Sequence, residues 1–306
     1  MGTWLEHPGY IATREALIQY LCVAPYRFRR LSPVIFLCGG AGSSVRDTLR
    51  DYLKKHVPGV SLFYAERVWE QIASRVEHGA LKMESDLAEL ADLVIIIVES
   101  PGTCAELGAF SLSEPLRKKL LPIVDGRYER ESSFIATGPL RWIDAVSDFK
   151  PTIYVAFSQI LEAVAEIEDR IARIPKSQTV KVVADLAASP KHLLFFLCDL
   201  IAVIHPATIE MIEYYLGRIA PSILSSAINV PTLVGLATAM DLLRVKTLDA
   251  DGKSERYYSP ALPDATDHPF HHVRLLNLSS QRAAHVSVLL KVPEARAILS
   301  EVRGTE

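Results

Sequence analysis

Several features that would place a protein in a specialised class are missing from this sequence. Its 306 residues include four cysteines and no Cys-x-x-Cys pair, so neither a zinc ribbon nor a disulfide framework is expected. The longest apolar run, residues 193–204, is interrupted by Asp199 and is too short to span a bilayer. Residues 1–14 do not have the pattern of a cleavable signal. We therefore expect a reduced cytoplasmic protein without membrane segments.

A strong charge of either sign is also missing. Lysine and arginine number 33 against 36 aspartates and glutamates, which gives a net charge of −3 and predicts no generic affinity for nucleic acid. No cluster of histidine, cysteine and carboxylate has metal-ligand spacing, so no metal is expected. Hydrophobic residues make up 49% of the chain, enough to fill the cores of the two domains that this length favours.

What is present in the first half is an alternation of apolar strands and amphipathic helices. Strands are predicted over residues 34–38, 60–64, 93–98, 120–124 and 152–155, and helices over residues 45–56, 68–77, 83–91 and 103–113. The run Leu93–Val98 is apolar throughout, as in a strand that is buried on both faces of a parallel sheet. The alternation predicts an α/β fold with a doubly wound parallel sheet.

The second half has a different pattern. A long helix over residues 157–174 ends at a Pro-Lys-Ser-Gln stretch, which we interpret as a domain boundary and which divides the chain into residues 1–176 and 177–306. Helices are predicted over residues 190–203, 207–219 and 232–243. Two short strands joined by an Asp-Gly turn follow. Three helices and a hairpin are the layout of a winged-helix domain, which would bind nucleic acid or a protein partner.

The most informative side chain is Glu106. It follows the strand Leu93–Val98 and a Pro-Gly turn, and Thr103 is a natural N-cap for a helix that would carry Glu106 in its first turn. A carboxylate would then lie at the carboxyl edge of a central strand, where open α/β sheets bind ligands. The alternative is a capping box that pairs Thr103 with Glu106 and has no function beyond the helix start.

A second loop is expected at the same edge. A glycine-rich turn joins the strand over 34–38 to its helix, and a helix N-terminus of this kind favours a phosphate or a nucleotide. It fits neither the P-loop nor the complete dinucleotide pattern, and a simple tight turn remains the alternative. Together the two turns predict a crevice, with these candidate substrate-binding residues: Gly39, Gly40, Gly42, Ser43, Ser100, Gly102 and Thr103.

The chemistry that suits this crevice is attack on a sugar. The chain has no Gly-x-Ser-x-Gly elbow and no predicted metal, so a lone carboxylate is the candidate catalytic group. A carboxylate stabilises or captures the oxocarbenium-like transition state that forms at an anomeric carbon. Glu106 is therefore predicted to act at an anomeric carbon of a bound nucleotide.

These residues resemble nucleoside deoxyribosyltransferases. The resemblance covers about residues 33–124 and is carried by Ser85-Asp86-Leu87 and by Pro101-Gly102-Thr103-x-x-Glu106-Leu107-Gly108. It implies that Glu106 is the nucleophile and that Asp86 contacts the departing base or the sugar. The sequence departs from the family at Ser100, where the family often has an acidic residue.

Such a domain followed by a winged helix resembles the effector proteins of retron antiphage systems. The resemblance implies an N-glycosidase toxin that acts on NAD or a related nucleotide. It also implies that a reverse transcriptase and its branched DNA–RNA hold the toxin in check, in a complex that allows an oligomer. Two other functions stay open: a nucleotide-sensing winged-helix DNA-binding regulator, and a nucleoside deoxyribosyltransferase.

The second domain is a poor candidate for binding DNA by itself. Residues 178–306 contain 12 lysines and arginines against 13 aspartates and glutamates, whereas autonomous DNA binding requires an excess of positive charge. The helix over residues 232–243 is nearly all apolar, which argues against base readout. Lys246, Lys253 and Arg256 on the hairpin are the predicted phosphate contacts.

Overall fold

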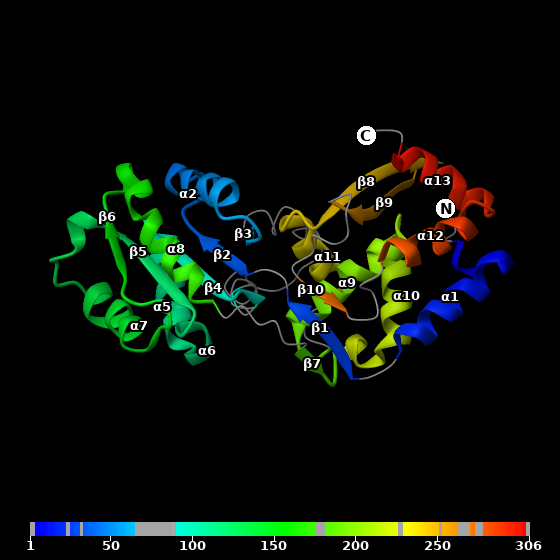
Figure 1. Ribbon diagram of the computed structural model, residues 1–306. Coiled ribbons are helices and arrows are strands. Elements are labelled where there is room, and N and C mark those ends of the chain that lie inside the picture. The colour runs from blue at the N-terminus through cyan, green and yellow to red at the C-terminus, as the bar shows by residue number, and fades with distance from the viewer. Residues whose placement is uncertain are drawn as a thin grey trace. The chain divides into compact units, whose positions relative to one another are not determined.

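The computed structural model divides the chain into two compact units (Figure 1). One comprises residues 32–176, which we call the α/β unit, and the other comprises residues 1–31 together with 177–306, which we call the helical unit. The structure describes residues 4–22, 25–30, 33–64, 88, 90–174, 181–225, 229–250, 253–261, 270–272 and 278–303.

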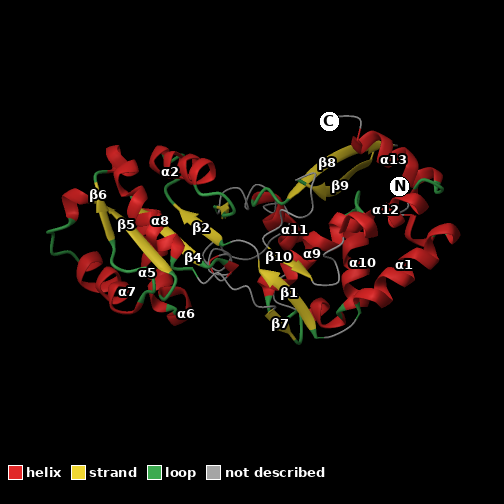
Figure 2. Ribbon diagram, in the orientation of Figure 1, coloured by secondary structure: helices red, strands yellow, loops and turns green. Residues whose placement is uncertain are grey.

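The α/β unit is built on a five-stranded parallel sheet (Figure 2). Its strands lie in the order β3-β2-β4-β5-β6, with bounds Ser61–Phe63, Val34–Cys38, Leu93–Val98, Leu120–Asp125 and Ile153–Val155. β2 and β4 are buried along almost their whole length, as expected for central strands with helices on both faces. This confirms the predicted α/β class with a parallel sheet.

Helices cover both faces of this sheet. Leu49 and Leu53 of α2 (Ser44–His56) share one apolar core with the strands, the 3-10 helix η4 (Phe157–Ala163) and α8 (Val164–Ala172). α5 (Pro101–Leu112) packs against β4 on the other face, and α2 and α5 lie on opposite sides of the sheet in Figure 1. The elements that follow α5 are α6 (Glu114–Arg117), the 3-10 helix η2 (Gly126–Tyr128), the π-helical turn η3 (Ala136–Leu140) and α7 (Arg141–Val146).

Two helix predictions in this unit need correction. The single helix expected over residues 157–174 is interrupted, because Gln159 has non-helical backbone angles (φ −127°, ψ 34°) and separates η4 from a regular α8. The helix expected from Thr103 begins two residues earlier, at Pro101. The helices expected over residues 68–77 and 83–91 fall almost entirely outside the described residues.

The helical unit is organised around α9 (Pro190–Ile204). Every residue of this helix from His192 to Ile204 is buried. α10 (Ile209–Ile219), α11 (Val230–Ala239) and α12 (Leu278–Leu289) pack against it. The hairpin of β8 (Leu243–Ala250) and β9 (Lys253–Pro260) follows α11, and α13 (Pro293–Arg303) closes the unit. The predicted order of helices and hairpin is therefore present.

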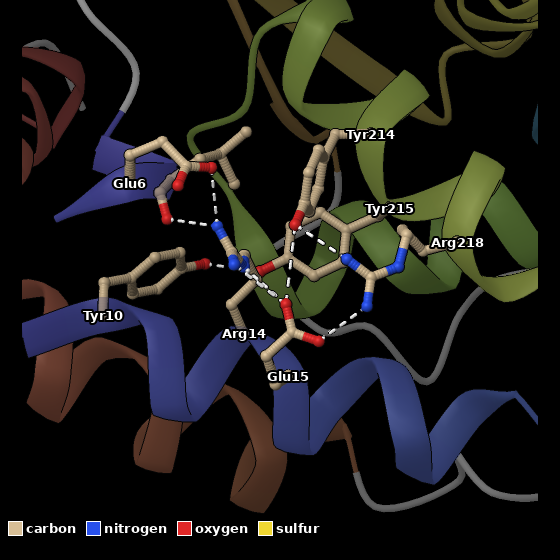
Figure 3. Close-up of polar contacts among 8 residues, drawn as sticks. Glu6, Tyr10, Arg14, Glu15, Tyr214, Tyr215 and Arg218 are labelled. Atoms are coloured by element: carbon tan, nitrogen blue, oxygen red, sulfur yellow. Dashed lines mark hydrogen bonds and ion pairs between the residues drawn. The ribbon is translucent and has the colours of Figure 1, made fainter. Parts of the chain in front are cut away.

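The first 31 residues pack with the helical unit rather than with the α/β unit, which differs from the predicted division at residues 1–176. Polar contacts between α1 (Pro8–Leu21) and α10 explain the difference (Figure 3). The Tyr10 and Tyr215 hydroxyls lie 2.7 Å apart, and Arg218 pairs with Glu15 at 2.8 Å. Arg14, only 6% exposed, stacks over the Tyr214 ring at 4.9 Å. The predicted boundary after residue 176 coincides with the division between the units.

A small antiparallel sheet ties the beginning of the chain to its second half. β1 (Tyr26–Arg30) lies between β7 (Lys181–Val183) and β10 (Phe270–His272). Phe28 pairs in register with both Lys181 and His272. Among the described residues, no helix combines the length and apolar character that crossing a membrane requires.

Candidate active site at the switch point of the sheet

The strand order places a topological switch point between the carboxyl ends of β2 and β4. The chain leaves β2 through α2 toward one edge of the sheet, to β3, and leaves β4 through α5 toward the other edge, to β5. Parallel crossovers are right-handed, so these two helices lie on opposite faces and their connecting loops diverge. Ligands of doubly wound folds bind at this switch point. Both predicted turns lie there.

The glycine-rich loop after β2 is shaped by close approaches. A Cβ at Gly39 would lie 2.9 Å from Arg46 Cδ and 3.0 Å from Arg46 Cβ. Gly42 has φ +69°, a left-handed conformation that favours glycine. The Ser43 hydroxyl accepts the Arg46 N–H at 3.0 Å and caps α2. Two of the four predicted binding residues in this loop, Gly39 and Gly42, determine its backbone path. A third, Ser43, caps the N-terminal end of α2.

The turn after β4 is held by Thr103. Its Oγ1 accepts the Glu99 N–H at 3.0 Å and the Ser100 N–H at 2.9 Å. The Ser100 hydroxyl accepts the Thr103 N–H at 3.2 Å in return, which completes a capping box. Thr103 is 1% exposed, so its hydroxyl organises the turn and is not presented to solvent. Gly102, in contrast, is exposed in the first turn of α5.

This geometry corrects the expected position of Glu106. Ser100, not Thr103, is the N-cap of α5, and Pro101 takes the first helical position, where a proline costs no hydrogen bond. Glu106 therefore lies in the second turn of α5. The alternative of a capping box between Thr103 and Glu106 is wrong, because the partner of Thr103 in the box is Ser100.

The side chain that joins the two loops is Glu99. Its Oε1 accepts the Gly40 N–H at 2.8 Å, a charge-assisted bond across the switch point. The sequence alone predicted no role for Glu99. The signal that could have identified it is its place at the end of a central strand beside a loop with free backbone donors. The Glu99–Gly40 bond therefore ties the loop after β2 to the turn after β4.

Glu106 itself is half-buried, with its Oε2 atom inside the protein. Thr103, Leu107 and Phe110 form the inward face of α5, and Cys104 faces a cavity on the side of β5 and β6. At about 100° per residue, Glu106 lies about 160° around the helix from Cys104. It therefore belongs to the flank of α5 that faces β2. Asp86, the other predicted catalytic residue, lies outside the described residues.

The cavity beside Cys104 has a volume of about 360 Å³. It lies at the carboxyl ends of β4, β5 and β6, and Glu99 and Ser100 belong to its lining while Glu106 does not. Burial raises the pKa of the Cys104 thiol, which keeps the thiol protonated and makes it a poor nucleophile. Among the described residues, no group of three or more histidine, cysteine or carboxylate side chains could hold a metal ion.

Two of the predicted nucleic-acid contacts, Lys246 and Arg256, lie on opposite faces of the hairpin. Lys246 pairs in register with Tyr257 and Lys253 with Ala250, whereas Arg256 pairs with Thr247. Because side chains alternate along a strand, Lys246 belongs to one face of the hairpin and Arg256 to the other, whereas the side chain of Lys253 lies outside the described part of the chain. The Lys246 ammonium donates to the Glu301 carbonyl of α13, so it is already engaged within the unit. Arg256 is exposed.

The helix before the hairpin does not present a reading surface. Every residue of α11 is buried or half-buried, with Leu233, Val234 and Leu236 at most 1% exposed. A recognition helix needs an exposed polar face that enters the major groove. The apolar character noted in the sequence is thus explained by burial, and α11 is not available to read bases.

Comparison with known proteins identifies the family of this chain. A family model described as the STM3845 retron effector protein matches residues 42–244, more than half of the chain. The chain belongs to this retron effector family. The matched region contains the Ser43 cap, Ser100, Thr103 and Glu106, and continues through α11 of the helical unit. Gly39, Gly40 and the three basic residues of the hairpin lie outside it.

Two curated relatives from Escherichia coli are similar over a shorter stretch. One, named "Retron Ec86 putative ribosyltransferase/DNA-binding protein", is 41% identical over 120 residues, which cover 38% of this chain and 39% of the relative. Another, named "Retron Ec73 putative ribosyltransferase/DNA-binding protein", is 36% identical over 117 residues, which cover 36% of this chain and 37% of the relative. The chain matches about two fifths of the length of these relatives.

Proposed function

We propose that this retron effector is a toxin that cleaves the N-glycosidic bond of NAD or a related nucleotide, with Glu106 as the nucleophile. The observation that carries the proposal is the position of Glu106 on the β2-facing flank of α5, next to two loops that Glu99 joins at the switch point. Membership of a retron effector family and the ribosyltransferase names of the relatives support it.

The proposed reaction needs no redox or metal partner. A Glu106 carboxylate oxygen attacks C1′ of the ribose that carries nicotinamide, and the C1′–N bond breaks. The bonding electron pair moves to the pyridinium nitrogen, so nicotinamide leaves as a neutral molecule without needing a proton. Water then attacks C1′ of the glycosyl ester, releases ADP-ribose, restores the carboxylate and yields one proton. Asp86 is proposed to orient the sugar or the departing base.

The loops would hold the rest of the nucleotide. The N-terminal ends of α2 and α5 offer backbone N–H groups and a partial positive charge to a phosphate. Gly102 is exposed and leaves the backbone open to close approach, whereas the Gly40 N–H is held by Glu99. Ser43, Ser100 and Thr103 shape the two turns through their caps. The predicted binding residues thus divide into those that would contact substrate and those that position the loops.

The helical unit is proposed to be a winged-helix-like module that contacts the reverse transcriptase and its branched DNA–RNA, which hold the toxin inactive. The order of α9, α10, α11 and the hairpin supports this assignment, as does an isolated bridge between Ala207 and Tyr258. Because α11 is buried, contacts with nucleic acid would come from exposed hairpin residues such as Arg244 and Arg256.

The test is product analysis by mass spectrometry after incubation with NAD and, separately, with deoxynucleosides. The wild-type chain, a Glu106→Gln variant and a Glu114→Gln variant are compared. Glu114 is the matched control, since it is an exposed glutamate of the same unit that pairs with Lys118 at 2.9 Å. Nicotinamide from the wild type and the control alone is the expected result. Base exchange between deoxynucleosides would instead indicate a transferase, and retained turnover by Glu106→Gln would exclude the proposed nucleophile.

A further inference from the structure

The cavity at the ends of β4, β5 and β6 has a regular floor. Val98 is in register with Val124, and Val124 with Tyr154, so these three side chains form one row across the strands on the α5 side of the sheet. Residues of η2 and η3, among them Tyr128 and Leu140, form walls of the cavity. The N-terminal turn of α5 forms a further wall. The cavity is therefore made from secondary structure that the sheet holds in place.

The lining suits a flat ring with polar edges. The floor is apolar and includes Tyr154, whose pKa is raised by burial and by the nearby Asp144 and Glu129 carboxylates, so its phenol stays neutral. The rim is polar and exposed, with Arg127 lying over the Tyr128 ring at 4.9 Å. At about 360 Å³ the cavity is near the small end of ligand pockets, about 300–1,000 Å³. It has room for one ring system and a sugar, not for a whole dinucleotide.

The cavity is separate from the proposed reaction centre but adjoins it. Cys104 faces the cavity, whereas Glu106 lies on the opposite flank of α5. Glu99 connects them, because it lines the cavity and accepts the Gly40 N–H of the switch-point loop. The N-terminal end of α5 lies between the two places, and it is a suitable position for the phosphates of a linker. A ligand that occupies both places has two ring systems joined through phosphates.

We infer that this cavity binds the adenine end of a dinucleotide while the bond to the other base is cleaved beside Glu106. The inference rests on the proposed function and narrows its substrate class. A simple nucleoside would fill the reaction centre and leave the cavity unused, so the chain prefers a dinucleotide to a mononucleotide. Tyr128 and Tyr154 are the specificity residues that this assignment names.

The first experiment measures binding without turnover. Calorimetry on the full-length Glu106→Gln chain records the affinity for AMP, which carries the adenine end alone, and for nicotinamide mononucleotide, which lacks it. A further Tyr128→Ala change is introduced at a position that is 42% exposed, and Phe134→Ala is the control, since Phe134 is an 85% exposed aromatic outside this cavity. We expect Tyr128→Ala to weaken AMP binding by at least about fivefold, the loss of one stacking contact. Phe134→Ala leaves it unchanged, and neither change alters binding of nicotinamide mononucleotide.

Two results would overturn the inference: no binding of AMP, or equal binding of AMP with and without Tyr128. The second experiment compares NAD cleavage by the otherwise wild-type chain with and without Tyr128→Ala, where KM rises and kcat stays the same. If the wild type releases nicotinamide but Tyr128→Ala has the wild-type KM, the cavity assignment fails and the proposed function stands. If AMP binds through Tyr128 and no NAD is cleaved, the proposed function fails and the assignment of the cavity to adenine stands.

Discussion

Replacing Thr103 by valine tests whether one hydroxyl holds the turn beneath the candidate site. Valine has almost the same shape and removes only Oγ1. The Ser100 N–H would lose its acceptor at 2.9 Å. The Glu99 N–H would lose one at 3.0 Å but would keep the Ile97 carbonyl, also at 3.0 Å. The damage is therefore concentrated on one backbone donor.

The expected loss of stability follows from the number of backbone N–H groups that lose their acceptor. The Ser100 N–H is part-buried, and a buried donor left without a partner costs about 1–3 kcal/mol. The Ser100 carbonyl also loses the bond that it accepts from the Thr103 hydroxyl at 2.9 Å, whereas the Glu99 N–H adds little because it keeps an acceptor. We predict that Thr103→Val lowers the free energy of unfolding of the α/β unit by about 2 kcal/mol. Thr103→Ser keeps the hydroxyl and should cost less than about 1 kcal/mol, mostly from the lost methyl group.

Hydrogen exchange measured by mass spectrometry can follow this unit by itself. A loss of about 2 kcal/mol makes exchange through unfolding about 30-fold faster. Peptides that cover β4 and α5 should show this acceleration in Thr103→Val and not in Thr103→Ser, while peptides from α9 in the helical unit serve as the internal reference. Equal exchange in the two variants would refute the role assigned to the hydroxyl.

Two further predictions concern a glycine and a histidine. Gly39→Ala should destabilise the α/β unit by about 1–3 kcal/mol, because its Cβ would lie 3.0 Å from Arg46 Cβ. Gly108→Ala, with open space around its Cβ, should instead stabilise α5 by about 0.5–1 kcal/mol. Urea titrations of both variants check that the two changes in stability have opposite signs. Burial, with the nearby Arg282 charge, lowers the pKa of His285 to about 3, whereas a histidine in the unfolded chain titrates near about 6.5. The unfolded state alone binds this proton between those values, so stability should fall as the pH drops below about 6.5, by up to about 1.4 kcal/mol per pH unit. A His285→Gln variant whose urea midpoints depend on pH as steeply as those of the wild type would contradict this assignment.

The sequence predicted the fold well where the pattern of apolar residues is compatible with only one secondary structure and position. Residues of β4 are apolar on both faces, and only a central strand accommodates that pattern. The start of α5 was misplaced because Pro101 was taken as the end of a turn, although a proline also fits the first position of a helix. Local patterns cannot distinguish these two roles when Ser100 and Thr103 are both good caps.

The contacts that sequence reasoning missed join residues far apart in the chain. β1 was not predicted as a strand, although Tyr26 and Phe28 alternate with arginines and are buried. Its partners, β7 and β10, lie more than 150 residues further along the chain. Glu99 was left without a role for the same reason, since its acceptor function depends on Gly40, 59 residues earlier. Helices α12 and α13 were also not expected.

The most direct test of the central claim is chemical rescue of a Glu106→Ala chain. The alanine removes the proposed nucleophile and leaves a space that azide can enter, so NAD cleavage is followed by mass spectrometry with and without azide. We predict nicotinamide release by the wild type, none by Glu106→Ala alone, and in azide a restored release with ADP-ribosyl azide as the second product. Cleavage of NAD by Glu106→Ala at the wild-type rate without azide would contradict it.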